Sequence, residues 1–168
     1  MNHLEGMMAI DTRKVANRRQ IHFQTINDIL KDVEHLNEGK IKPLGNWSGG
    51  QILKHLATVM NTSIDGSPLR LSWFIRLLGW MMKRRILTKG MVPGFQLKGK
   101  TAEFLVPPPT TWEEGLEIFR QAVRRQQTES RRQPSPFLGT LTREQWEQLH
   151  CRHAELHLSF LLPANEPL

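Results

Sequence analysis

Two histidines near the end of the chain, His153 and His157, are four residues apart in a stretch with helical spacing of apolar residues. On a helix their imidazoles stack about one turn apart on one face. Both project among the apolar side chains that this face should bury, including Trp146 and Phe160. A buried imidazole must find a polar partner or lose several kcal/mol of solvation, and a divalent metal ion is one such partner. The pair therefore predicts a metal site.

The third ligand of such a site has to come from another helix. Catalytic metals typically have three protein ligands and keep one position open for water or substrate. His55 is the candidate, because it lies at the edge of the apolar stripe of the helix expected over residues 49–64. His150 lies close to the face of the last-helix pair. It could replace His55 as a ligand, act as a partner of a ligand or reach solvent at the stripe's edge, and we favour the last two roles.

Other residues of reactive type do not form a recognisable catalytic motif. Ala154 follows His153, so the general-base glutamate of a His-Glu-x-x-His motif is missing. Cys151 points away from the histidine pair and is expected to be a structural thiol. Glu155 is expected on the outer face of its helix, and Asp65 in the turn that ends the second helix. We therefore assign no catalytic residue beyond the metal ligands.

The composition is typical of one globular domain. Of the 168 residues, 39% are hydrophobic and 23% are charged, which is enough apolar material for a single core. The first ten residues have neither the basic nor the apolar region of a signal peptide. The single cysteine excludes an internal disulfide and fits a reducing cytoplasm.

The net charge of +7 raises the question of a nucleic-acid or membrane partner. The basic residues gather over 13–19, 83–85 and 120–132, without interleaved exposed aromatics, so we interpret them as solvated helix faces and ends. The most apolar run, residues 71–82, is interrupted by Arg76 and is too short to span a bilayer. We expect a small-molecule substrate and no membrane partner. A nucleic-acid-binding protein that uses the positive charge is the minority hypothesis, and salt-sensitive binding to a generic duplex would support it.

Helical spacing predicts an all-α protein with four long helices and one short one. Capping-box patterns at Ser48, Thr111 and Thr142 start three of the helices. The expected helices cover residues 12–38, 49–64, 71–87, 111–127 and 142–163, the third being the short one. Amphipathic helices joined by loops should pack as a bundle, in whose core metal sites are common.

The segment 88–110 is predicted to be a long loop that covers the metal pocket. It contains three consecutive prolines and little periodicity, and loops of this length are often functional. Residues 96–97 and 103–106 could form short strands. The bundle domain is expected to span residues 11–163, between a flexible N-terminus of residues 1–10 and a flexible C-terminus of residues 164–168.

The chain resembles the DinB/YfiT-like superfamily of metalloenzymes, in particular a branch known as a domain of unknown function. The resemblance extends from about Arg19 to Phe160 and rests on two ordered segments. One is Trp47-Ser48-x-x-Gln51-x-x-x-His55-Leu56. The other is Ser135-Pro136-Phe137-x-Gly139-x-Leu141-Thr142-x-Glu144-Gln145-Trp146-x-x-Leu149-x-x-x-His153-x-x-x-His157-Leu158.

The resemblance implies an up-down-down-up four-helix bundle, often a homodimer. It also implies a divalent metal such as nickel, zinc or iron, and by position the ligands are His55, His153 and His157. Relatives in the superfamily include transferases and isomerases that use low-molecular-weight thiols. The superfamily's name records induction by DNA damage and does not imply DNA binding. The long 88–110 segment and the additional His150 depart from the better-known relatives.

The leading hypothesis from the sequence is a small metal-dependent enzyme. Its metal would act as a Lewis acid that lowers the pKa of a bound water or thiol. Thiol transfer and metal-assisted hydrolysis are the two reactions considered. The alternative is a non-catalytic stress-response or binding module whose metal is structural or vestigial.

Overall fold

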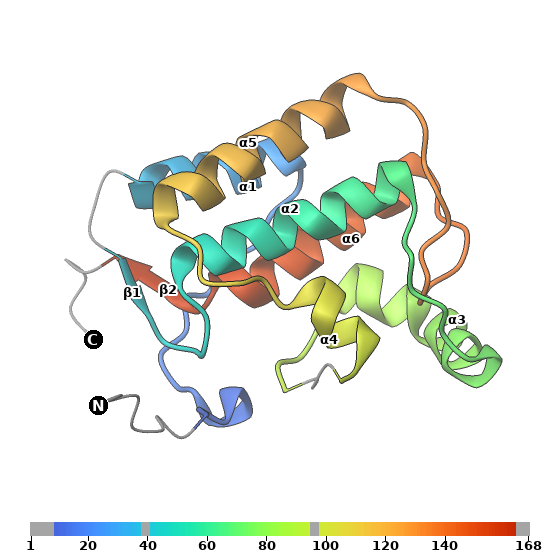
Figure 1. Cartoon of the computed structure of the whole chain (residues 1–168), viewed down its shortest axis with the longest axis horizontal. Helices are drawn as coiled ribbons and strands as arrows, with labels where there is room; N and C mark the ends of the chain where they lie inside the picture. The colour runs from blue at the N-terminus through green and yellow to red at the C-terminus, as the bar shows by residue number, and fades with distance from the viewer. Residues whose placement is uncertain (1–8, 38–40, 95–97, 164–168) are drawn as a thin grey trace.

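The computed structural model describes residues 9–37, 41–94 and 98–163, which form a mostly helical protein with one small sheet (Figure 1). The predicted flexible ends fall largely on residues 1–8 and 164–168, outside the described residues. Every helix in the described part is too short or too polar to cross a bilayer. In chain order the elements are η1 (Thr12–Lys14), α1 (Ile26–Asn37), β1 (Ile41–Pro43), α2 (Gly49–Asp65), α3 (Trp73–Lys89), α4 (Lys100–Leu105), α5 (Trp112–Thr128), α6 (Arg143–Leu158) and β2 (Leu161–Pro163).

The four helices α1, α2, α5 and α6 lie side by side, and α3 lies beside one end of α6 (Figure 1). Helices α2 and α5 run away from the small sheet, whereas α1 and α6 run back toward it. The apolar core fills the space between these four helices, with Ile29, Leu53, Phe119 and Leu158 fully buried. Such close packing holds the facing sides of α2 and α6 at a fixed separation.

The predicted starts of three long helices are confirmed. Ser48 and Gln51 form a reciprocal capping box at the start of α2, and Thr142 and Gln145 form another at α6. The Thr111 side chain caps α5 by accepting from the backbone N–H of Glu114. These bonds satisfy backbone donors that have no partner within the helix, so the first turns of α2 and α6 are well fixed.

The predicted first helix, residues 12–38, is wrong at its N-terminal half. The structure has only the short η1 there, and α1 begins at Ile26. Asn17 adopts a φ of 59°, which interrupts a helix. The Asp28 carboxylate accepts from the backbone N–H groups of Gln24 and Thr25 and so caps α1 at this point. The predicted end at residue 38 lies outside the described residues.

Two further expectations for secondary structure need correction. Residues 103–105 belong to the helix α4 rather than to a strand, while residues 96–97 lie outside the described part. The last helix ends at Leu158 instead of at Pro163. Beyond it, β2 pairs antiparallel with β1 and makes the small sheet that the all-α prediction did not include. Strands of three residues are too short to show a period of two.

The contact between α2 and α5 depends on two facing glycines. A Cβ at Gly50 would overlap the carbonyl oxygens of Thr110 and Thr111, and a Cβ at Gly115 would overlap the backbone of Gly50. The helices therefore approach as closely as their backbones allow. This contact matters for the site, because α2 also carries His55.

Replacing Gly50 with alanine is expected to lower the free energy of unfolding by about 3 kcal/mol, because the new methyl group has no room between two backbones. Urea unfolding at neutral pH measures the change. The matched control is Gly45→Ala, whose Cβ would meet Phe160 only at an ordinary contact distance of 3.4 Å. Equal effects of the two substitutions would show that α2 and α5 are not held together in this way.

Candidate metal centre

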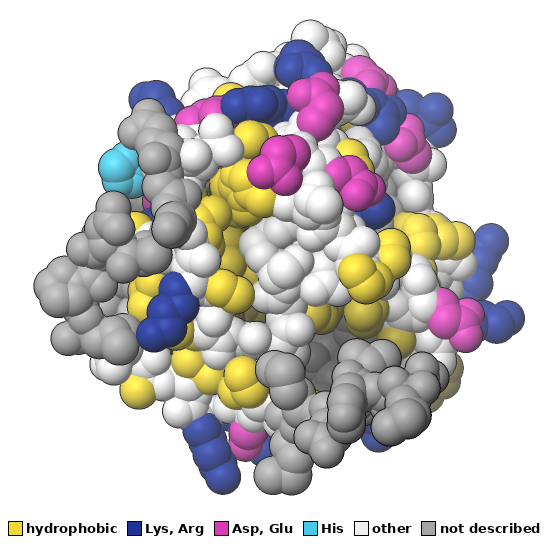
Figure 2. All heavy atoms as spheres, turned by 60° about the vertical axis from the view of Figure 1, so that its left-hand side comes forward, with side chains coloured by type: hydrophobic (Ala, Val, Ile, Leu, Met, Phe, Trp, Pro, Cys, Tyr) yellow, Lys and Arg dark blue, Asp and Glu magenta, His cyan; other side chains and the backbone are white. Residues whose placement is uncertain are grey.

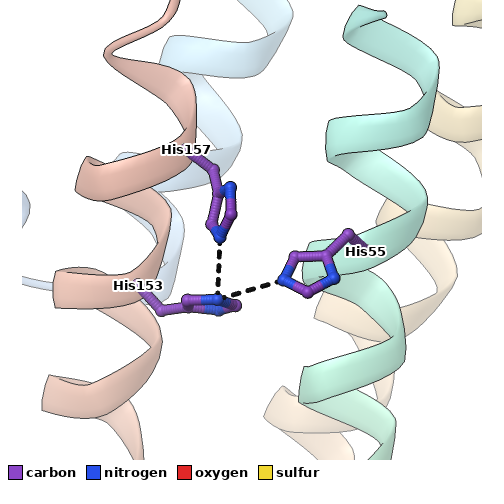
Figure 3. Close-up of side chains that lie close together, drawn as sticks. All are labelled: His55, His153 and His157. Atoms are coloured by element: carbon purple, nitrogen blue, oxygen red, sulfur yellow. Dashed lines mark hydrogen bonds between the residues drawn. The ribbon is translucent and has the colours of Figure 1, made fainter. Parts of the chain in front are cut away.

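Three histidines from two helices converge at one point between α2 and α6 (Figure 3). The Nε2 atom of His153 lies 3.2 Å from Nε2 of His55 and 3.0 Å from Nε2 of His157. The ligand atoms of the three side chains all lie within 4.8 Å of one another. The structure thus brings together all three residues that were predicted as ligands.

The folding of α6 explains the placement of its two histidines. Their i, i+4 spacing puts both rings on the side of α6 that faces α2. On the neighbouring side of the helix, Ala154 and Leu158 are completely buried in the core and fix the rotation of α6 about its axis. His55 is fixed in the same way, because the adjacent Leu56 and Ala57 are also buried in this core.

The hydrogen bond of His55 selects its tautomer. Its Nδ1 atom lies 2.7 Å from the carbonyl oxygen of Leu105, at the end of α4. A carbonyl oxygen only accepts, so Nδ1 carries the proton and donates it. The Nε2 atom of neutral His55 then keeps a lone pair, which is directed at His153 (Figure 3). Metal-binding histidines typically have such a partner on the nitrogen remote from the metal.

The protons available do not satisfy all the nitrogens of the cluster. Because Nε2 of His55 is an acceptor, His153 must supply a proton from its own Nε2 to bond it. That nitrogen then cannot accept from His157, so its single proton would have to serve two neighbours. A cation at the centre can accept all three lone pairs at once. The donor set therefore fits a metal ion better than it fits a hydrogen-bonded cluster.

The distances also suit a metal ion. With zinc–nitrogen bonds of about 2.0–2.1 Å, two ligands of a tetrahedral site lie about 3.3 Å apart. The two Nε2–Nε2 distances of 3.2 Å and 3.0 Å are close to that value.

Burial keeps the three imidazoles in the neutral form that a metal requires. It lowers the pKa of His55 to about 4, against a small opposing effect of the hydrogen bond to Leu105. The pKa values of His153 and His157 are also lowered well below the usual 6.5, first by burial of the rings and then by neighbouring histidines. At neutral pH none of the three has to lose a proton before it binds a cation.

Trp47 forms an aromatic wall of the site. Its ring stacks on that of His157 with 5.6 Å between centroids and 7° between planes, and it lies 4.9 Å from the ring of His55. In the sequence, Trp47 stands in the motif that precedes His55, but it was not expected at the site. Trp47 lies directly before the N-cap of α2, so the helical spacing of α2 does not predict where its ring points. The motif was the only feature of the sequence that linked Trp47 to His55.

His150 has a different role from those favoured at first. It is 2% exposed, so the expected contact with solvent is wrong. Its Nε2 atom lies 3.3 Å from the hydroxyl oxygen of Ser63, and its ring stacks on Trp146. Burial, with a contribution from the positive charge of Arg132, lowers its pKa to about 3. His150 is therefore a neutral core residue outside the three-histidine group.

The remaining reactive side chains are engaged elsewhere. Cys151 is buried, and burial raises the pKa of its thiol to about 12, as expected of a structural cysteine. Glu155 pairs with Arg152 and accepts from the backbone N–H of Phe23. Asp65 pairs with Arg125 on the surface. None of the three belongs to the histidine cluster.

The segment that follows α3 reaches the site through backbone oxygens. Besides the bond from His55 to Leu105, the Gln51 side chain donates to the carbonyl oxygen of Pro107. Helix α4 and the residues that follow it are thus attached to α2 at His55 and Gln51. The described part of the expected loop therefore contributes a hydrogen-bond partner of His55.

Comparison with known families finds one match, over residues 15–164, to a family described as a protein of unknown function (DUF1569). The match covers most of the chain, and the chain belongs to this family. It agrees with the expected branch of unknown function. Comparisons with curated proteins and with solved structures found no match.

Proposed function

We propose that this member of the DUF1569 family is a metal-dependent enzyme in which His55, His153 and His157 hold one divalent cation, such as nickel, zinc or iron. The observation that supports this most strongly is the convergence of three neutral imidazoles that lack the protons to bond one another. Without a metal ion, imidazole nitrogens that are removed from water beside the core and lack a hydrogen-bond partner would lose solvation free energy.

We also assign the chain to the DinB-like superfamily with an up-down-down-up bundle. Helices α1, α2, α5 and α6 supply the four helices of this bundle, and their directions in Figure 1 follow this order. Helix α3 lies outside them and, with 17 residues, is not the short helix that was expected. The ligand positions support the same assignment, with one histidine on the second of the four helices and a pair on the last.

The number of ligands favours a catalytic site over a structural one. Structural zinc sites typically have four protein ligands, whereas the group found in the described residues has three. A divalent cation bound there would supply Lewis-acid activation of a water molecule or a thiol. All three ligands are neutral, so they leave the positive charge of the cation available to an anionic nucleophile such as a thiolate.

The protein's own residues orient and shield this centre. The Leu105 carbonyl holds the ring of His55, and Trp47 covers one side of His157. The segment 105–107 is bonded to α2 and limits access of water. We propose a small-molecule substrate, with transfer of a low-molecular-weight thiol or hydrolysis as the reaction.

Metal-linked thermal stability tests this proposal. Untagged protein is freed of metal with a chelator and titrated with nickel, zinc or, without oxygen, ferrous iron. A cation that binds only the folded state adds about 2.7 kcal/mol of stability at 100 times its dissociation constant, so the melting temperature should rise by several degrees. If none of these cations binds stoichiometrically under any loading condition, the proposal is contradicted.

The reaction class can be examined on the same material. In protein loaded with nickel, addition of a low-molecular-weight thiol should produce a near-ultraviolet thiolate-to-metal absorption band. The control variant is His22→Ala, which should give the same band as the wild type. This exposed histidine contacts Glu155 and lies outside the cluster. Metal uptake without any thiol band, but with turnover of an ester or amide, would instead favour hydrolysis.

A further inference from the structure

Helix α3 exposes apolar side chains over most of its surface. Trp73 is 75% exposed, Trp80 66% and Met81 68%. Five further large apolar residues of the helix are also exposed: Phe74, Ile75, Leu77, Leu78 and Met82. Contiguous apolar surface of this kind marks an interaction site.

This exposure follows from where α3 lies. The helix packs on the molecule through Gly79, Ile86 and Leu87, which are its buried residues. A Cβ at Gly79 would overlap the carbonyl oxygen of Phe137, so the helix approaches the loop before α6 closely on that side. Figure 1 shows α3 at the periphery, apart from α1, α2, α5 and α6. The rest of its circumference faces outward.

The positive charge of the protein is concentrated in the same part of the chain. Residues 66–102 contain eight basic residues and no acidic residue, whereas the rest of the chain contains 15 basic and 16 acidic residues. The basic residues of the segment are Arg70, Arg76, Lys83, Arg84, Arg85, Lys89, Lys98 and Lys100. The segment therefore carries a charge of +8, and the remainder of the protein is almost neutral.

Several basic residues elsewhere have acidic partners. On the face shown in Figure 2, Lys and Arg side chains toward the top lie among Asp and Glu side chains. Ion pairs in the described part of the chain include Arg120–Glu34 and Arg124–Glu117. The α3 segment contains no acidic residue with which to form such pairs.

Apolar and basic residues share one outward side of α3. Trp73, Leu77 and Met81 follow at intervals of four residues, and Arg84 and Arg85 continue along this side after three and four more. All five side chains are exposed. A groove of about 460 Å³ between α3 and α6 is lined by Trp80, Lys83 and Arg84, among others, and so repeats the combination of aromatic and basic groups.

We propose that α3 attaches the protein to the surface of an anionic lipid bilayer. Helices that lie in the membrane interface combine Trp, Phe and Leu with Lys and Arg, and α3 has both sets at high exposure. The apolar side chains insert at the boundary of the acyl chains, while the basic groups contact lipid phosphates.

This form of attachment does not require a spanning helix. The expectation of no membrane partner rested on the length needed to cross a bilayer and on the interpretation of the basic residues as solvated helix faces. Surface attachment requires instead that exposed apolar and basic side chains lie together, as they do on α3. At 17 residues, α3 is long enough to lie along the surface.

Charge disfavours the other occupants of this face. A second copy would bring two segments of +8 together without acidic residues of their own. A nucleic acid would satisfy the charge but would leave the tryptophans and methionines of the N-terminal half of α3 without a partner. An anionic bilayer is complementary to both features. The proposal does not rest on the metal centre.

Vesicle co-sedimentation of the full chain tests the proposal. The protein should bind vesicles of phosphatidylserine and phosphatidylcholine at least about tenfold more tightly than vesicles of phosphatidylcholine alone, because each basic residue near an anionic surface contributes about fivefold. Binding should weaken as salt is added. Equal binding to both vesicles, or no binding, would overturn the proposal.

Two double variants separate the contributions. Trp73→Gln with Trp80→Gln, and Arg84→Glu with Arg85→Glu, should each weaken binding to anionic vesicles roughly tenfold or more. All four positions are exposed, so the fold should be retained. The control Lys31→Glu with Arg124→Glu changes the net charge equally on exposed residues outside the segment and should bind nearly as the wild type does.

The same samples identify the competing partners. Size-exclusion chromatography with light scattering should show that the tryptophan variant does not change the oligomeric state. A wild-type dimer that this variant dissociates, without vesicle binding, would overturn the proposal in favour of a second copy. Salt-sensitive binding to duplex DNA without binding to anionic vesicles would overturn it in favour of nucleic acid.

Discussion

Replacing His153 with alanine is expected to remove stoichiometric binding of a divalent cation at micromolar concentrations. His153 is the central residue of the cluster, since its Nε2 atom is within 3.2 Å of both other ligand nitrogens. Four-ligand zinc sites are worth about 10–16 kcal/mol, so loss of one ligand should weaken binding roughly 100-fold or more. Metal analysis after desalting and calorimetric titration both measure the loss.

The fold should survive this substitution, which keeps the interpretation clear. His153 is only partly buried, and the alanine removes an unfavourably desolvated group. In the metal-free state His153→Ala should therefore melt within a few degrees of the wild type. His22→Ala again serves as the control and should bind metal as the wild type does. A His153→Ala protein that keeps one tightly bound cation would show that the site lies elsewhere.

Mild acid is expected to destabilise the metal-free protein strongly. Burial lowers the pKa of His55 to about 4 and that of His150 to about 3, and it lowers those of His153 and His157 in the same direction. The unfolded chain takes up a proton on each histidine near pH 6.5, whereas the folded protein does not do so until far lower pH. Stability is therefore complete above about pH 6.5 and decreases as the pH falls toward the folded-state values.

The expected size is large for a protein of this length. Each of the four histidines contributes up to about 1.4 kcal/mol per pH unit below 6.5. Their sum over one unit is comparable to the total stability of many domains, which is about 5–15 kcal/mol. Urea midpoints of the metal-free protein measured at several pH values between neutrality and pH 5 should fall steeply.

The substitution His150→Gln isolates the contribution of one histidine to this pH dependence. His150→Gln keeps a polar side chain near Ser63 but removes one buried titrating group, so the slope with pH should decrease by about one proton. Bound metal should raise the stability without reducing this slope, because unfolding releases the cation and the three freed imidazoles still take up protons. Urea midpoints that do not change between pH 7 and pH 5 would show that these rings titrate normally and are solvated.

The three histidines of the candidate site were predictable because their spacing agreed with the apolar stripes of their helices. The i, i+4 spacing of His153 and His157 coincided with the apolar stripe of their helix, and the stripe around His55 gave the third position. Helix rotation is fixed by the buried residues, so the direction of each imidazole followed from the sequence. The capping boxes fixed the helix starts for the same reason, since they are local.

The parts that could not be predicted depend on contacts between distant segments. The β1–β2 sheet joins residues more than a hundred positions apart, and α4 has no long apolar stripe. The burial of His150 depends on Ser63 and Trp146, and spacing along one helix does not reveal this. The basic residues of α3 were expected to be solvated, but a sequence does not show that the apolar residues beside them stay uncovered.

X-ray absorption at the edge of the bound metal reports its ligands directly. Wild-type protein loaded with one equivalent of zinc or nickel should show three imidazole nitrogens at about 2.0–2.1 Å and one exchangeable oxygen ligand such as water. In the His153→Ala protein loaded in the same way, this three-imidazole signature should be absent. A wild-type spectrum with only oxygen ligands, or with the sulfur of Cys151, would contradict the three-histidine centre.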